Sequence, residues 1–141
     1  MTDLQRAIAI AVAAHHSQRD RNGAPYILHP LRVMLRVGTA EQQIAAVLHD
    51  VVEDTPWTLD ALRAEGFSKA VVHAVDCLTR REGEDYFDFV LRSKSDPIAR
   101  VVKLADLEDN MDVNRMTQVA DKDVERLNRY KRAKAMIEAE S

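Results

Sequence analysis

The chain has 141 residues, of which 46% are hydrophobic and 30% are charged, ordinary values for one globular domain with its own core. A formal net charge of −3 argues against nucleic-acid binding as the main task, because that task normally needs a basic surface. No apolar stretch reaches the roughly 20 residues that span a bilayer, and the apolar N-terminal segment lacks the basic region and cleavage site of a signal peptide. The single cysteine excludes an internal disulfide, so we expect a cytoplasmic protein.

Helices are predicted along the whole chain, because it has only four glycines and four prolines and is rich in good helix formers. Apolar spacing and capping residues place them, in chain order, at about residues 4–16, 30–38, 39–55, 58–65, 68–79, 86–91, 97–111 and 123–139. The polar stretch 18–25 contains Gly23 and Pro25 and is a predicted loop. We therefore predict an all-α fold of about seven to eight helices, forming one domain over residues 1–141.

The last predicted helix is rich in charged residues, which is typical of a solvated face. Its expected inner stripe consists of Val124, Leu127, Tyr130, Ala133 or Lys134, and Ile137. This stripe would pack against the rest of the domain or equally serve a dimer, so the sequence allows a homo-oligomer.

One short segment brings an imidazole and three carboxylates together, at His49, Asp50, Glu53 and Asp54, directly after the apolar run 44–48. Residues three and four apart share a helix face, so a continuous helix would place His49 over Glu53. The same spacing would place Asp50 over both Glu53 and Asp54. Carboxylates drawn toward an apolar interior are costly unless a cation or hydrogen bonds compensate them. A metal ion would compensate them, and two further segments support that interpretation.

On the predicted 97–111 helix, Asp106 shares a stripe with Ile98, Val102 and Asn110 at spacings of four, so its carboxylate should face the same interior. His29 closes a loop immediately before a predicted helix. The candidate metal ligands are therefore His29, His49, Asp50 and Asp106. A mixed set of nitrogen and oxygen donors suits Mn²⁺, Fe²⁺, Zn²⁺ or Ni²⁺ better than Ca²⁺. Four protein ligands leave room for a water of lowered pKa, which is a ready nucleophile for hydrolysis.

Three blocks of sequence carry a family resemblance: residues 15–18 with 25–30, residues 46–55, and residues 102–111. Their order and spacing resemble the HD-domain metal-dependent phosphohydrolases, specifically the hydrolase domain of the RelA/SpoT alarmone enzymes and its small stand-alone relatives. The resemblance covers about residues 4–115. It implies removal of the 3′-diphosphate from guanosine tetra- or pentaphosphate, usually with Mn²⁺, the alternatives being Fe²⁺, Zn²⁺, Ni²⁺ and Mg²⁺. No synthetase domain would fit in this length, so hydrolysis alone is expected.

The resemblance also implies roles for individual residues. The four candidate ligands match the metal ligands of the family. Glu53 and Asp54 match the acidic pair assigned to water activation and proton transfer. Asn110 matches the residue that contacts the substrate near its ribose and phosphates. From residue chemistry, further substrate contacts are expected from Arg19, Arg21, Lys103 and Tyr26.

Three positions depart from the family pattern. Asp20 stands where the long alarmone enzymes have an arginine that contacts the nucleotide, although Arg19 and Arg21 flank it. Leu107 and Asp112 replace two further arginines. These changes spare the metal ligands but remove positive charge near the expected phosphates and base. The reaction type therefore transfers better than the substrate.

Plainer interpretations compete with each assignment. Asp50 and Asp106 would also suit buried ion pairs with Arg or Lys. His29 would suit a backbone hydrogen bond, the acidic pair a solvated helix end, and Asn110 a helix cap. Each basic candidate, including Arg32, would suit an ordinary surface charge, and Tyr26 a place in the core.

The leading functional hypothesis is a metal-dependent phosphohydrolase of a small phosphorylated nucleotide. Two alternatives stay open at this point. One is a nucleoside 5′-monophosphatase of the broader HD group. The other is a non-catalytic nucleotide-binding or interaction module that keeps the metal for folding.

Overall fold

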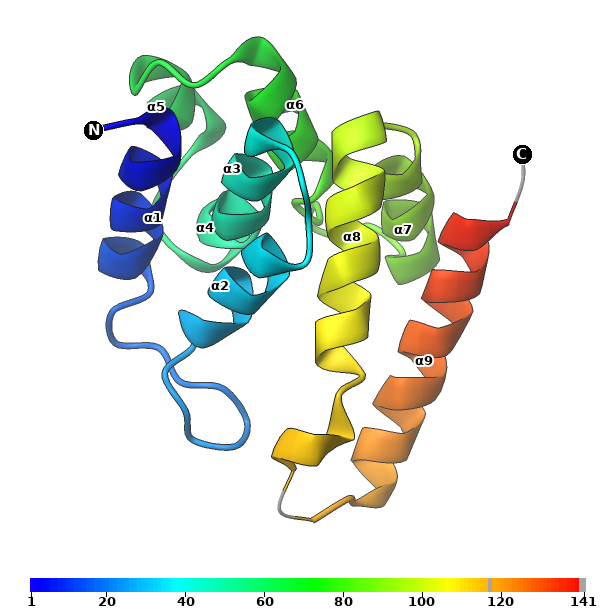
Figure 1. The fold of residues 1–141 in the computed structure, drawn as a ribbon. Helices are drawn as coiled ribbons and strands as arrows, with labels where there is room; N and C mark the ends of the chain where they lie inside the picture. The colour runs from blue at the N-terminus through cyan, green and yellow to red at the C-terminus, as the bar shows by residue number, and fades with distance from the viewer. Residues whose placement is uncertain (117, 140–141) are drawn as a thin grey trace.

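The computed structural model describes residues 1–116 and 118–139, whose regular structure is helical apart from one isolated antiparallel bridge between Arg19 and Pro25. This part of the chain forms nine α-helices and one short 3-10 helix (Figure 1). They are α1 (Asp3–Ala14), α2 (Leu28–Leu35), α3 (Ala40–Leu48), α4 (Val51–Asp54), α5 (Leu59–Ala64), α6 (Lys69–Cys77), α7 (Tyr86–Lys94), α8 (Pro97–Asn110), η1 (Val113–Arg115) and α9 (Asp121–Glu138). The all-α prediction is confirmed. None of these helices combines the length and the hydropathy needed to traverse a bilayer.

Side-chain caps begin several helices where the sequence predicts them. The Thr39 hydroxyl accepts a hydrogen bond from Gln42 N at 3.2 Å, and the Gln42 side-chain oxygen accepts one from Thr39 N, which completes a capping box. Asp96 caps α8 by accepting hydrogen bonds from Ile98 N and Ala99 N, with Pro97 in the first turn. Gly66 follows α5 with a φ of +89°, a left-handed conformation that glycine adopts without strain.

The predicted continuous helix over 39–55 is wrong, because the chain breaks between α3 and α4. The last turn of α3 tightens to a bond from His49 N to Ala46 O, and His49 Nδ1 donates to the same carbonyl at 2.6 Å. Asp50 has φ −104° and ψ −1°, which departs from the angles of a regular α-helix, about −63° and about −42°. His49 and Asp50 therefore project from a junction between two helices, which raises the helix count above the expected seven to eight.

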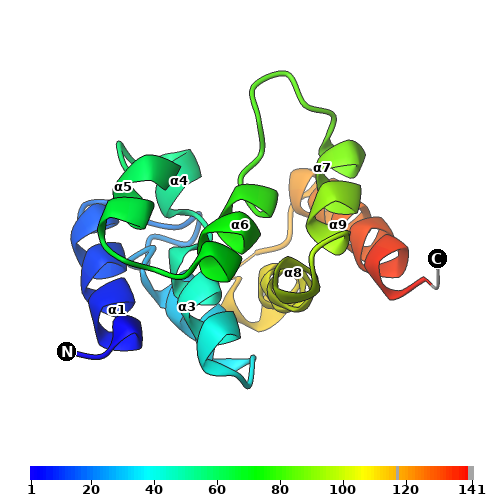
Figure 2. The same cartoon turned by 90° about the horizontal axis from the view of Figure 1, so that it is seen from above.

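Helix α8 is the centre of the packing. It lies against α2, α3 and α6 on one side and against α7 and α9 on the other (Figures 1 and 2). One apolar cluster, which includes Leu62, joins α1, α3, α5 and α6. A second joins α2, α3, α6 and α8 through Val33 and Val102, and a third joins α7, α8 and α9 through Leu107 and Ile137. This arrangement brings α8 beside both the start of α2 and the α3–α4 junction.

The inner stripe of α9 is shorter than expected. Ala133 and Ile137 are buried, with exposed fractions of 0% and 1%, and Ala133 rather than Lys134 takes the inner position. Val124 is 46% exposed, so its assignment to the inner stripe is wrong. The first turns of α9 extend past the apolar cluster, and there the helix borders a polar cavity instead.

Candidate metal centre

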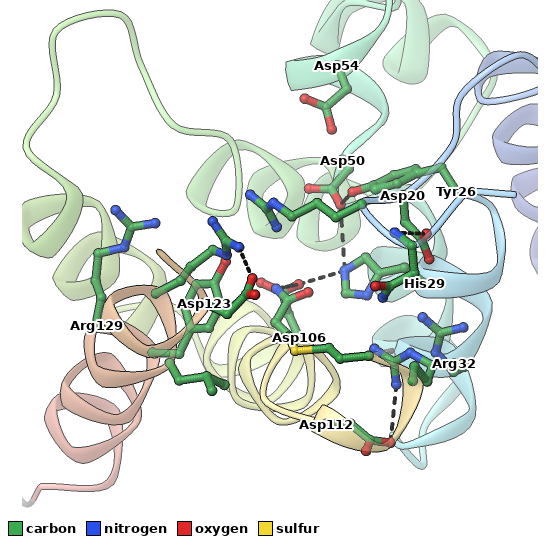
Figure 3. A pocket seen from close by; sticks show the side chains of 18 of the residues that line it. Asp20, Tyr26, His29, Arg32, Asp50, Asp54, Asp106, Asp112, Asp123 and Arg129 are labelled. Atoms are coloured by element: carbon green, nitrogen blue, oxygen red, sulfur yellow. Dashed lines mark hydrogen bonds and ion pairs between the residues drawn. The ribbon is translucent and has the colours of Figure 1, made fainter. Parts of the chain in front are cut away.

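The four predicted ligands meet at the point where α2, the α3–α4 junction and α8 come together. Three of them, His29, Asp50 and Asp106, are labelled in Figure 3. His29 Nε2 lies 2.8 Å from Asp106 Oδ1 and 3.9 Å from Asp50 Oδ2. His49 Nε2 lies 3.0 Å from Asp50 Oδ2 and 3.3 Å from Asp106 Oδ1. Donor atoms of His29, His49 and Asp50 all lie within 4.8 Å of one another, so these three residues could hold one metal ion.

Both imidazoles present the same nitrogen to this cluster. The Nδ1 of His49 is occupied by the hydrogen bond to Ala46 O, and the Nδ1 of His29 donates to Asp109 Oδ2 at 2.6 Å. In the neutral ring, each Nε2 then carries the lone pair that could bind a metal ion. The two imidazole nitrogens and a carboxylate oxygen of Asp50 form a donor group that suits a divalent metal ion, and Asp106 Oδ1 lies within 3.3 Å of both nitrogens.

The cluster is also a set of compensated charges. Burial opposes the charged forms, but contacts with Asp106 and Asp109 raise the pKa of His29, and contacts with Asp50 and Asp106 raise the pKa of His49. Burial likewise works against the Asp106 carboxylate, yet Lys103 and the two histidines hold its pKa well below its usual range. A metal ion would supply the positive charge that the histidines otherwise provide.

A second acidic group borders the cluster. Carboxylate oxygens of Asp50, Glu53 and Asp54 lie within 4.8 Å of one another. Glu53 Oε1 accepts a hydrogen bond from Arg80 N at 2.8 Å, whereas the Asp54 carboxylate has no protein donor among the described residues. Partial burial raises the pKa of Asp54 to about 7, and the charges of Asp50 and Glu53 add to the shift. Asp54 is therefore poised to exchange a proton near neutral pH.

A cavity of about 680 Å³ opens over this acidic group and the metal cluster. Its wall includes all five residues predicted to contact the substrate: Arg19, Arg21, Tyr26, Lys103 and Asn110. His29, Asp50 and Asp106 also border it, while His49 lies buried beneath. The cavity is lined by segments far apart in sequence, from the 18–25 loop to α9 (Figure 3).

Three of those five residues are already engaged with the candidate ligands. The Tyr26 hydroxyl donates a short hydrogen bond to Asp50 Oδ2. Lys103 is buried, and its Nζ donates to Asp106 Oδ2 at 3.0 Å. Asn110 Nδ2 donates to Asp106 Oδ1 at 3.2 Å. The buried ion pair that competed with metal ligation for Asp106 is thus present, but it uses the oxygen that faces away from His29 Nε2.

The positions that depart from the family pattern have structural roles. Asp20 Oδ1 accepts hydrogen bonds from Asn22 N at 2.8 Å and Ala24 N at 3.0 Å, which holds the loop. Leu107 is fully buried in the cluster between α7, α8 and α9. Asp112 pairs with Arg115 at 3.2 Å.

Several residues of the site were missed by sequence reasoning. Arg80, Arg115, Arg126 and Arg129 line the cavity from loops and helices that carry none of the family blocks, so no local pattern marks them. Asp109 is fully buried against His29. It lies three residues after Asp106 on the same helix, a spacing that could have pointed to it.

In a comparison with known protein families, residues 7–139 match the HD domain. The chain is 40% identical over 121 residues to a probable GTP pyrophosphokinase of Mycobacterium leprae. It is 34% identical over 121 residues to a guanosine-3′,5′-bis(diphosphate) 3′-pyrophosphohydrolase of Aquifex aeolicus, and 36% identical over 117 residues to a protein of the same name in Haemophilus influenzae. These matches cover 77%, 77% and 72% of this chain but only 15%, 17% and 17% of the relatives.

The fold is also similar to a solved structure, that of a metazoan orthologue of SpoT that hydrolyses ppGpp and plays a role in starvation responses. The TM-score is 0.78, and the match covers 97% of this chain and 85% of that chain. Since only 20% of the residues are identical, this likeness concerns the fold.

Proposed function

The chain belongs to the HD-domain family, and on this premise we propose that it is a metal-dependent hydrolase of a small phosphorylated nucleotide. The expected resemblance to the RelA/SpoT proteins is confirmed by relatives that are 34% to 40% identical. We propose guanosine 3′,5′-bis(diphosphate) as the substrate and its 3′-diphosphate as the leaving group, because two relatives are named for that hydrolysis.

The convergence of the two Nε2 atoms with carboxylates of Asp50 and Asp106, at the floor of a cavity, is the observation that best supports this proposal. His29, His49, Asp50 and Asp106 would hold the ion, with Mn²⁺ as the proposed metal. A divalent ion held there would supply a Lewis acid and lower the pKa of water.

Asp54 is the proposed proton acceptor. Its pKa of about 7 suits proton transfer near neutral pH, and no protein donor among the described residues occupies its carboxylate. Glu53 Oε1 accepts a hydrogen bond from the Arg80 amide at 2.8 Å, so we assign to Glu53 the role of orienting the water. Its negative charge also helps to raise the pKa of Asp54. Asn110 and Tyr26 would keep the two ligand carboxylates oriented through their hydrogen bonds.

The phosphates of the substrate would be bound by arginines that have no carboxylate partner. In the described part of the chain, Arg32, Arg115 and Arg126 form ion pairs with aspartates. No such pair involves the cavity-lining residues Arg19, Arg21, Arg80 and Arg129. Arg129, on α9, lies across the cavity from Tyr26 (Figure 3). These residues would supply the positive charge that Asp20, Leu107 and Asp112 remove.

An assay of product identity tests the proposal. The protein, loaded with Mn²⁺, is incubated with guanosine 3′,5′-bis(diphosphate) and with nucleoside 5′-mono-, di- and triphosphates, and both orthophosphate and diphosphate are measured. We expect diphosphate from the first substrate, and none above background from His49→Ala or Asp50→Ala. Orthophosphate from monophosphates alone would favour the 5′-monophosphatase alternative. Nucleotide binding without any turnover would favour the non-catalytic module.

A further inference from the structure

Asp109 is a fully buried carboxylate beside the candidate metal ligands. It lies on α8, its exposed fraction is 0%, and its Oδ2 accepts the hydrogen bond from His29 Nδ1 at 2.6 Å. The family blocks that predict the candidate ligands assign no role to Asp109. A fully buried carboxylate is rare unless its charge and lone pairs are satisfied, so its partners indicate what it does.

The other oxygen of Asp109 is held by arginines. Oδ1 accepts from Arg32 Nε at 2.9 Å and from Arg115 Nη1 at 3.4 Å, and Arg36 Nη2 lies 3.8 Å away. Arg115 Nη2 also donates to the Asp109 carbonyl at 2.8 Å. These contacts neutralise the carboxylate and prevent its rotation. Within residues 1–116 and 118–139, Oδ2 then has one hydrogen-bond partner, the Nδ1–H group of His29.

We propose that Asp109 is a positioning residue that selects the metal-binding nitrogen of His29. With the proton of the imidazole held at Nδ1, Nε2 must present its lone pair to the cluster formed with His49, Asp50 and Asp106. The inference rests on the proposed metal site. It adds that the fit of this site to a metal depends on a carboxylate that touches neither metal nor substrate.

Substitution by asparagine separates this role from simple packing, because it keeps the shape and removes one acceptor. The amide oxygen of Asp109→Asn would face the cationic donors of Arg32 and Arg115, so its NH₂ group would face His29. Nδ1 would then have to accept a hydrogen bond, and the ring proton would move to Nε2, the atom that faces the ligands. Partners of this kind typically change metal affinity by about 10–100-fold.

Asp112→Asn is the matched control. Asp112 also pairs with Arg115, at 3.2 Å, but it does not contact His29. Both variants therefore weaken the hold on Arg115, and only Asp109→Asn changes the partner of the imidazole.

The test measures Zn²⁺ affinity by competition with a chelating dye, and ¹⁵N NMR of labelled histidine in the Zn²⁺-loaded protein. We expect about 10–100-fold weaker binding for Asp109→Asn, loss of the Nε2-coordinated signal of His29 and retention of that of His49. Asp112→Asn should match the wild type. If Asp109→Asn does not fold, Asp109→Glu keeps the charge but displaces the carboxylate from Nδ1, and it should weaken binding in the same direction.

Two outcomes have different meanings. Unchanged affinity and an unchanged His29 signal in a folded Asp109 variant would overturn this inference and leave the proposed function standing. A wild-type protein that binds neither Zn²⁺ nor Mn²⁺ would overturn the metal site and the proposed function together.

Discussion

Lys103 and Asp106 lie one turn apart on α8 and form a buried ion pair, with Nζ donating to Oδ2 at 3.0 Å. The other oxygen of the same carboxylate is 2.8 Å from His29 Nε2. Asp106 therefore divides its two oxygens between a permanent cation and the candidate metal cluster. A buried carboxylate that is compensated by two cations is stable inside the protein. If one cation is removed, the stability of the fold should depend more strongly on the other.

Lys103→Met should destabilise the metal-free protein more than the metal-loaded protein. Without Lys103 the buried carboxylate loses a compensating charge, which typically costs about 3 kcal/mol or more, whereas bound Mn²⁺ would restore part of that charge. Urea unfolding with a chelator and with Mn²⁺ gives both values. The exposed Lys69→Met is the control and should change neither. An equal loss under the two conditions would show that Lys103 acts independently of the metal.

Addition of Mn²⁺ should raise the melting temperature. A ligand at about 100 times its Kd stabilises the folded state by about 2.7 kcal/mol, which corresponds to roughly 5–10 °C for a chain of this size. His49→Ala should abolish the shift because it removes a ligand. His73→Ala should keep it, since the His73 side chain on α6 is 64% exposed. A shift that survives in His49→Ala would place the bound metal elsewhere.

Tyr26→Phe should weaken Mn²⁺ binding without unfolding the protein. The Tyr26 hydroxyl donates to Asp50 Oδ2, and residues that orient a ligand in this way change affinity by about 10-fold or more. Tyr130→Phe removes a hydroxyl from the same cavity that makes no hydrogen bond with a described residue, so it serves as the control. Calorimetric titration compares the two variants. Equal affinities for both would exclude an orienting role for Tyr26.

Glu84→Gln should reduce the effect of acid on stability. Arg92 donates to both Glu84 oxygens, at 2.8 and 3.0 Å, and lowers the pKa of this carboxyl from 4.5 to about 2. A carboxylate with a lowered pKa stabilises the folded state fully above its unfolded pKa, and this contribution is lost as the pH falls through the folded pKa. The stability difference between wild type and variant should therefore shrink on acidification from pH 4.5 toward pH 2.

Urea unfolding across this range measures that difference. The neighbouring Glu82→Gln, whose side chain is exposed, is the matched control and should follow the wild type at every pH. A difference between wild type and Glu84→Gln that stays constant over the range would contradict the prediction.

Ile137→Ala should destabilise the protein by about 2–5 kcal/mol, because it leaves a cavity in the buried cluster between α7, α8 and α9. Val124→Ala, on the same helix, should have a small effect, because Val124 is 46% exposed. Thermal or urea unfolding of both variants measures the two effects. Comparable losses would mean that the N-terminal half of α9 also packs against apolar partners.

Local patterns in the sequence predicted most of the helices. The Thr39–Gln42 capping box, Asp96 before Pro97, and the apolar spacing of α6 depend on neighbours within one or two turns, so each could be identified without the rest of the chain. The break at His49 could not. The break depends on the hydrogen bond from the His49 side chain to Ala46 O and on the contact of His49 with Asp106 of α8.

Local patterns also predicted which residues would form the candidate metal centre. His49, Asp50 and Asp106 each stand beside apolar residues of an amphipathic helix, so their burial followed from periodicity, and the three family blocks related them to one another. Their distances, and the question of which carboxylate oxygen faces which cation, lay beyond such patterns. Arg80 and Arg129 reach the site from segments far from the family blocks, and nothing nearby in sequence marks them. Asp109 lies only three residues after Asp106, but its contact with His29 depends on the packing of α2 against α8. Helix formation is governed by short-range geometry, whereas a site assembled from four helices exists only once their packing has set the angles between them.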